Sequence, residues 1–162
     1  MMTLERIFCP IDLRPATDEG LSCALALAKA YEAEVYVCYA VETEDLTQEV
    51  EASLRAQLTE TVQKHCYHTN AGRPGMPNWK PIIRTGDAAE MITREAAAYH
   101  ADLIVMHSRR QSYAATLLGS TAEAISRTAP CPVLITHAHE RAWVAPGTGE
   151  IQLKNILMAY DF

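Results

Sequence analysis

Short apolar runs alternate along the chain with longer stretches in which apolar residues recur at helical spacing. The apolar runs are bounded by glycine, proline or polar residues, and they are short enough to be buried strands. Residues 34–41 (EVYVCYAV) are rich in β-branched and aromatic side chains, which favours a strand covered on both faces. Strands are predicted at residues 6–13, 34–41, 79–84, 103–106 and 132–136.

The stretches between these runs have the periodicity of helices. In the first stretch, Leu21, Leu25 and Ala28 lie on one helical face. Residues 46–68 have apolar side chains at four-residue steps, with charged residues between them. Two further helices are predicted, one before residue 100 and one that must stop before Pro130.

Capping signals mark where three of these helices begin. Asp87 is followed three residues later by Glu90, which is the spacing of a capping box. Ser120 and Glu123 repeat that spacing, and Thr17 is placed to cap the first helix.

This order of elements predicts an α/β domain, with an open five-stranded parallel sheet and helices on both faces. In such Rossmann-like sheets, ligands bind beyond the carboxyl ends of the strands, where the strand order reverses. We expect the reversal between the first and fourth strands, so that Asp12 and Met106 line one crevice.

Composition and charge exclude several classes of function. A chain of 162 residues fits one domain, and its net charge of −6 argues against a nucleic-acid partner. No apolar run is long enough to span a membrane, and the first residues lack a signal-peptide pattern. The five cysteines are an odd number and lie mostly in apolar segments, as expected of reduced core residues. We therefore expect a cytoplasmic protein with no nucleic-acid or membrane partner.

At the predicted strand ends, the sequence resembles the universal stress protein family. The matching segments are 7–12 (IFCPID), 86–87 (GD), 101–106 (ADLIVM), 117–123 (LLGSTAE) and 129–134 (APCPVL), in the family's order over about residues 4–136. The resemblance implies an adenine nucleotide alpha hydrolase-like fold and a role in the stress response. It also implies homodimers or tandem repeats and, in one branch of the family, bound ATP or AMP, with Mg²⁺ only as the nucleotide's companion.

The resemblance also implies which residues contact the nucleotide. In the ATP-binding branch, the aspartate matched by Asp12 contacts the ribose and adenine end, and the backbone matched by Val41 lies against the base. Gly119 and Ser120 match the helix start that faces the phosphates, where free N–H groups favour an anion. The candidate binding residues are Pro10, Ile11, Asp12, Val41, Met106, His107, Arg109, Arg110, Gly119, Ser120 and Thr121.

The sequence departs from the ATP-binding branch in the phosphate loop. The first two glycine positions of the family motif fall on His107 and Arg110, and eight residues instead of nine separate Arg110 from Gly119. Those glycines allow a close approach of backbone to phosphate. Arg109 and Arg110 could hold phosphates through their side chains instead. We expect a degenerate site at which ATP binds weakly or not at all.

Simpler interpretations stand beside these assignments. Asp12 could brace the loop that follows the first strand, and Gly119-Ser120 is a good helix start with or without a ligand. Arg109 and Arg110 could be a solvated pair. Residues 65–68 (HCYH) and 137–139 (HAH) contain metal-binding residue types, but neither has a second ligand pair at suitable spacing, and we expect no protein-bound metal.

Two functions remain open. One is a regulatory module that acts by dimerisation and by binding a ligand or partner. The other is an ATP-binding protein with weak ATP hydrolase activity. The sequence has no nucleophile elbow, Walker loop or zinc-hydrolase motif, which favours the first.

The end of the chain repeats features of its beginning. Leu4, Ile7 and Asp12 recur at a constant offset of 149 residues, which suggests a second copy of the first strand. We predict a domain at residues 1–139, a linker at 140–150 and an extra strand at 151–162. That strand begins a second repeat or, alternatively, is added to a sheet edge or exchanged with a partner.

Overall fold

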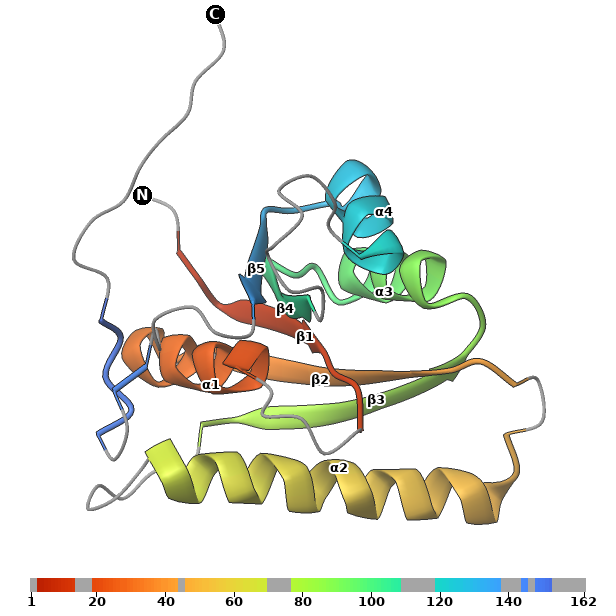
Figure 1. Cartoon of the computed structure of the whole chain (residues 1–162), viewed down its shortest axis with the longest axis horizontal. Helices are drawn as coiled ribbons and strands as arrows, with labels where there is room; N and C mark the ends of the chain where they lie inside the picture. Colours follow the sequence, from red (N-terminus) through yellow and green to blue (C-terminus); the bar gives the residue numbers. More distant parts are fainter. Residues whose placement is uncertain are drawn as a thin grey trace, which may run out of the picture.

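A computed structural model describes residues 3–13, 19–43, 46–69, 77–108, 119–137, 144–145 and 148–152. Strands and helices alternate along it, as the sequence predicts (Figure 1). The order of elements is β1 (Arg6–Pro10), α1 (Glu19–Tyr31), β2 (Glu34–Val41), α2 (Gln48–Thr69), β3 (Trp79–Thr85), α3 (Ala88–Ala98), β4 (Leu103–Ser108), α4 (Ser120–Thr128) and β5 (Val133–His137).

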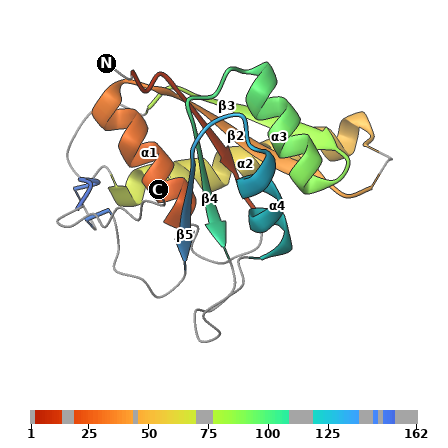
Figure 2. The same ribbon diagram turned by 90° about the horizontal axis from the view of Figure 1, so that it is seen from above.

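The strands form one parallel sheet in the order β3-β2-β1-β4-β5. The chain runs outward from β1 to β3, then returns to place β4 on the other side of β1, so the order reverses between β1 and β4. Helices α1 and α2 cover one face of the sheet, and α3 and α4 cover the other (Figure 2). The predicted fold class and the predicted reversal are both confirmed.

Each face of the sheet has its own apolar core. Neighbouring strand residues point to opposite faces, so Ile7 packs with α1 and α2 while Phe8 packs with α3 and α4. Leu25 and Leu58 are buried in the first core, and Met91 is buried in the second. Both faces of the central strands need apolar side chains, which is why these strands are continuous apolar runs.

Several element bounds differ from the prediction. The first strand ends at Pro10, before the predicted residue 13, and β4 continues past Met106 to Ser108. The extension of β4 is explained by its pairing with β5, in which Ser108 lies opposite His137. Ser120 is the first helical residue of α4, and the cap is Gly119 rather than Ser120. The Thr17 cap lies outside the described residues.

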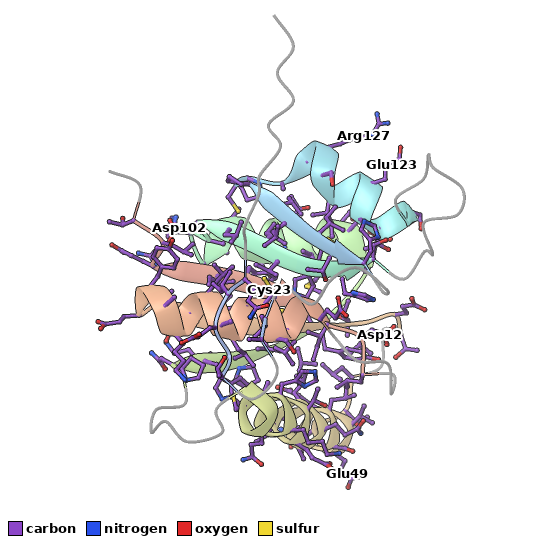
Figure 3. The ribbon with its side chains drawn as sticks, turned by 60° about the vertical axis from the view of Figure 1, so that its left-hand side comes forward. Asp12, Cys23, Glu49, Asp102, Glu123 and Arg127 are labelled. Carbon is purple, nitrogen blue, oxygen red and sulfur yellow. The ribbon has the colours of Figure 1, made fainter. Side chains whose placement is uncertain are left out.

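Polar side chains join the strands at the amino end of the sheet. The Asp102 carboxylate accepts hydrogen bonds from the backbone N–H groups of Glu5 (2.9 Å) and Arg6 (2.8 Å), which ties β1 to β4. The Glu34 carboxylate accepts from Tyr36, from Asn78 Nδ2 and from Lys80 Nζ, the last two at 2.9 Å. Asp102 and Asp12 lie at opposite ends of the sheet (Figure 3).

The described residues near the end of the chain form a short turn. Val144 and Ile151 pair as an isolated antiparallel bridge, and the Ala145 N–H donates to the Glu150 carbonyl at 2.8 Å. Val144 packs against the core that α1 covers. Most of the predicted extra strand lies outside the described residues, so the second-repeat hypothesis stays a prediction.

None of the helices in the described ranges is long and apolar enough to cross a membrane.

Candidate functional site

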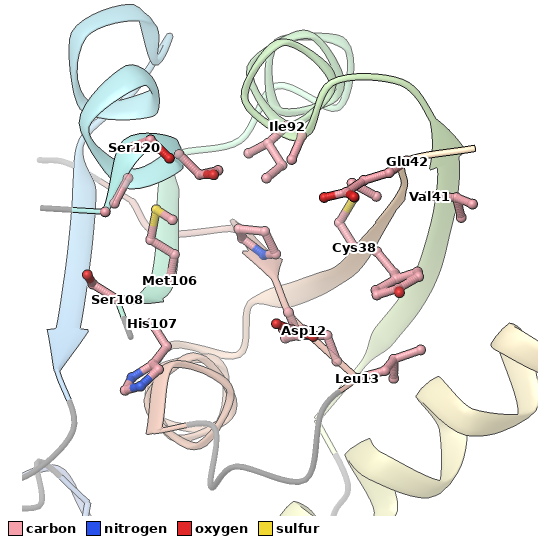
Figure 4. Close-up of a pocket in the computed structure, with 18 of the residues that line it drawn as sticks. Asp12, Leu13, Cys38, Val41, Glu42, Ile92, Met106, His107, Ser108 and Ser120 are labelled. Atoms are coloured by element: carbon pink, nitrogen blue, oxygen red, sulfur yellow. The ribbon is translucent and has the colours of Figure 1, made fainter. Parts of the chain in front are cut away.

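A cavity of about 670 Å³ lies at the carboxyl ends of the strands, where the strand order reverses. It is lined by the ends of β1, β2 and β4 and by the first turns of α3 and α4 (Figure 4). The structure brings nine predicted residues together in its lining: Pro10, Ile11, Asp12, Val41, Met106, His107, Gly119, Ser120 and Thr121. Arg109 and Arg110 lie outside the described residues.

The two sides of the cavity differ in chemistry. On the β2 side lie Cys38, Val41 and Glu42, and across from them lie Met106 and Ser120 (Figure 4). Asp12 lies between the two sides, beyond the end of β1. Carboxylates, which accept hydrogen bonds, therefore lie at the β1 and β2 ends, whereas the start of α4 lies on the β4 side.

The start of α4 supplies hydrogen-bond donors to the cavity. Its N-cap is Gly119, which has no side chain with which to cap the helix. The first backbone bond of the helix runs from the Glu123 N–H to the Gly119 carbonyl at 2.9 Å. The N–H groups of Ser120, Thr121 and Ala122 come before that bond and cannot pair within the helix. These N–H groups and the helix dipole together favour a negatively charged ligand group.

The neighbouring helix α3 starts differently. Its N-cap is Asp87, whose Oδ1 accepts hydrogen bonds from the N–H groups of Ala89 and Glu90, each at 3.0 Å. This confirms Asp87 as the predicted cap. Ala88 and Ile92 of α3 line the cavity, but their helix start is already occupied by its own carboxylate.

His107 occupies the position of the first glycine in the family motif, and it is a residue of β4. Its Nδ1 lies 3.2 Å from the Oγ1 of Thr136 on β5, and the Thr136 side chain is fully buried. A side chain therefore stands where the ATP-binding branch has none, and it is held by its neighbour on β5.

Ser108 also lines the cavity. It falls in the strand-end segment 106–110 that the predicted topology indicates, but it is not among the candidate binding residues. Its side chain is 3% exposed, and its Oγ has no hydrogen-bond partner within the described part of the chain. Its position two residues beyond Met106 places it on the same face of β4, which was the available signal. Leu13 and Glu42 lie at strand ends that the predicted topology indicates. Lining residues outside those segments are Cys38, Tyr39, Ala40, Thr43, Ala88, Ile92 and Ala122.

A buried cysteine also faces this cavity. Cys38 Sγ lies 3.7 Å from Met91 Sδ, and its residue is fully buried. Burial raises the pKa of the Cys38 thiol to about 12, because the buried site disfavours the thiolate. At neutral pH Cys38 is a small apolar residue of the cavity wall.

Among the described residues, no group of three histidine, cysteine or acidic side chains is placed to hold a metal ion. Of the two histidine-rich segments, His65 Nδ1 lies 2.9 Å from the Thr61 carbonyl within α2. His139 lies outside the described residues, and the side chain of His68 is not described.

An open parallel sheet with a cavity at its reversal point defines an α/β protein of the Rossmann-like class. The model of the universal stress protein family matches residues 3–137, and the chain belongs to this family. A curated universal stress protein from Methanothermobacter thermautotrophicus is 30% identical over 123 residues, which cover 72% of this chain and 84% of that protein.

Solved structures show the same fold. A universal stress protein in complex with cAMP matches with a TM-score of 0.62 at 14% identity, over 83% of this chain and 98% of that one. A universal stress protein from Archaeoglobus fulgidus in complex with dAMP matches with a TM-score of 0.55 at 18% identity, over 83% and 98% of the two chains.

Proposed function

We propose that this protein is a regulatory module of the stress response that binds an adenine nucleotide in the cavity at the carboxyl end of its sheet. The observation that carries this proposal is the convergence of nine predicted residues from β1, β2, β4 and α4 on one cavity. The two structural neighbours in complex with cAMP and dAMP support the choice of an adenine nucleotide.

The residues present fit the nucleoside part of such a ligand. A cavity of about 670 Å³ is within the range of small-molecule sites. Ile11 and Val41 offer apolar contact to a base, and the Asp12 carboxylate can accept hydrogen bonds from ribose hydroxyls. The uncapped start of α4 can donate to a phosphate group.

The residues fit a long phosphate chain less well. His107 fills the place of a glycine that would allow backbone to approach phosphate, and Asp12 and Glu42 add negative charge to the lining. Two carboxylates repel a polyphosphate more strongly than a single phosphate group. Weak ATP binding is therefore part of the proposal.

Dimerisation also belongs to the proposal. Among the described strands, β5 lies at an edge of the sheet, and the outer backbone groups of an edge strand can pair with a strand of a second sheet. A homodimer or a second repeat in the same chain would cover such an edge. Light scattering during size-exclusion chromatography distinguishes a monomer from a dimer.

Calorimetric titration with AMP, cAMP and ATP, the last with Mg²⁺, tests nucleotide binding. We expect AMP or cAMP to bind more tightly than ATP. Asp12→Asn should weaken binding of AMP about tenfold, because one charge-assisted hydrogen bond is weakened. The control is Glu60→Gln, which removes one negative charge from the exposed side of α2.

The outcomes separate clearly. No heat of binding with any nucleotide at millimolar concentration contradicts the proposal, as does an equal effect of Asp12→Asn and Glu60→Gln. Release of ADP and phosphate over hours at a rate that Asp12→Asn abolishes would favour the ATP hydrolase instead of the regulatory module.

A further inference from the structure

Two buried polar atoms belong to neighbouring residues at the carboxyl ends of β4 and β5. Ser108 and His137 are register partners, and register partners in a parallel pair point to the same sheet face. The preceding partners on that face, Met106 and Ile135, both pack in the core under α3 and α4. Ser108 Oγ and His137 Nδ1 are both buried, and neither has a hydrogen-bond partner in the ranges that the structure describes.

The opposite face of the same two strands gives a direct comparison. There, His107 and Thr136 are also register partners, and their side chains lie within hydrogen-bond distance at 3.2 Å. Buried polar groups in native proteins are nearly always paired, so two unpaired ones in adjacent positions call for a third group. The structure therefore points to a ligand group at Ser108 and His137.

The start of α4 lies against this pair. A Cβ placed on Gly119 would be 4.0 Å from Ser108 Oγ, so the hydroxyl faces the N-cap of a helix of nine residues. Ser108 lines the cavity on its β4 side, with Ser120 of α4 beyond it (Figure 4). His137 stands next to Ser108 on β5.

The chemistry of these groups identifies the ligand class. A serine hydroxyl, an imidazole protonated at Nδ1 and the N–H groups at the start of α4, which have no partner within the helix, can all act as donors. A group that only accepts, with several oxygens, satisfies all of them at once, and a phosphate is such a group. Asp12 and Glu42 line the other parts of the cavity and disfavour further phosphates.

We propose that Ser108 and His137 are specificity residues that select a ligand ending in a single phosphate group. Such a ligand is a nucleoside monophosphate, preferred over the free nucleoside and over the triphosphate. This inference rests on the proposed function, because it concerns the phosphate end of the same cavity. It adds Ser108, which lines that end of the cavity, and His137, the register partner of Ser108 on β5.

The test compares ligands that differ only at the phosphate end. Adenosine, AMP, ATP and inorganic phosphate are titrated into the wild-type protein and into the variants Ser108→Ala and His137→Leu. The wild type should bind AMP about tenfold or more tightly than adenosine, since each charge-assisted bond contributes about a factor of ten. Each variant should reduce that preference by about tenfold and leave adenosine affinity unchanged. Binding of inorganic phosphate should be weaker than that of AMP and lost in both variants.

Ser126→Ala is the matched control. The Ser126 hydroxyl already donates to the Ala122 carbonyl at 2.7 Å within α4, so its loss should leave the AMP preference unchanged. Ser108→Cys keeps the size of the side chain with a weak donor, and it should lower AMP affinity as Ser108→Ala does. If Ser108→Ala does not fold, Ser108→Cys measures the same loss of AMP affinity.

Melting temperature gives a second readout. Removing an unpaired buried hydroxyl should raise the melting temperature of the ligand-free protein by about 2–4 °C. A lower melting temperature in Ser108→Ala would mean that the hydroxyl is already paired, and it would overturn the proposal.

The ligand series separates this inference from the proposed function. A wild type that binds adenosine and AMP equally, or variants that weaken both equally, overturns the role of Ser108 and His137 but leaves nucleotide binding in place. Tighter binding of ATP than of AMP also overturns it. A wild type that binds none of the adenine ligands overturns the proposed function and this inference together.

Discussion

The two ends of the sheet use polar side chains in opposite ways. At the amino end, the Asp102 carboxylate accepts from two backbone N–H groups, and Glu34 accepts from three side chains. At the carboxyl end, Ser108 and His137 each have a buried atom without a partner among the described residues. Polar groups that are paired within the protein stabilise the fold, whereas unpaired ones are available to a ligand. The amino end therefore serves stability, and the carboxyl end is the part of the sheet to which we assign ligand binding.

Helices α3 and α4 repeat this contrast on one face of the sheet. The start of α3 is closed by Asp87, and the start of α4 has only Gly119. Both helices pack on the same core, so their different starts are not explained by burial. A capping side chain at α4 would occupy the place that we assign to an anionic group.

The largest expected effect on stability is at the amino end of the sheet. Asp102→Ala leaves the N–H groups of Glu5 and Arg6 without their acceptor and should lower the free energy of unfolding by about 2–3 kcal/mol. Asp102→Asn keeps an oxygen acceptor and should lose about half as much. Urea denaturation measures both. Nucleotide affinity should not change, and a loss of affinity in the folded variant would break the proposed division between the two ends.

Changing the N-cap residues of α3 and α4 should have a smaller effect on stability. Asp87→Ala removes a cap and should lower the free energy of unfolding by about 1 kcal/mol.

Gly119→Asp adds a cap at α4 and should raise the free energy of unfolding by about 0.5 kcal/mol, because the backbone there has a negative φ and the Cβ has room. The same variant should abolish the preference for AMP over adenosine, because its carboxylate occupies the anion position. Retained AMP preference in Gly119→Asp would contradict an anion site at α4.

The smallest expected loss of stability comes from Glu34 at the amino end, and it depends on pH. The hydrogen bonds from Tyr36 and Lys80 hold the pKa of the Glu34 carboxyl below its ordinary value. Its contribution is therefore present above about pH 4.5, the ordinary pKa, and is lost as the pH falls through the lower pKa of the folded state. Glu34→Gln should be less stable than the wild type by about 0.5–1 kcal/mol at pH 7, and by less at pH 3. Urea denaturation at the two pH values measures the difference, and a difference that does not shrink would contradict the assignment.

Local patterns in the sequence were sufficient for the architecture. The apolar runs, the helical periodicity and the Asp87 cap depend on neighbouring residues, and alternation of strands and helices then allows few topologies. The strand reversal placed Asp12 and Met106 at one cavity before any contact between them was known. The same rule indicated the segments that contain Val41 and Gly119, and the family resemblance added the parts of a nucleotide that they would contact.

Long-range pairing was not visible in the sequence. The predicted fourth strand stopped at Met106 because His107 and Ser108 are polar, yet both pair with β5. The neighbourhood of Ser108 and His137 depends on that register, which joins residues far apart in the chain. For the same reason the analysis missed Glu95, a buried residue of α3 whose carboxylate pairs with Arg84 of β3 at 3.3 Å.

The buried thiol beside the cavity has a consequence for redox chemistry. Burial raises the pKa of the Cys38 thiol to about 12, so the reactive thiolate is scarce at pH 7. Burial likewise raises the pKa of Cys23 to about 11. Oxidants and alkylating reagents attack the thiolate, so these cysteines react very slowly while the protein stays folded. A cavity whose wall contains sulfur from Cys38, beside Met91, can thus keep its shape under oxidative conditions that modify exposed thiols.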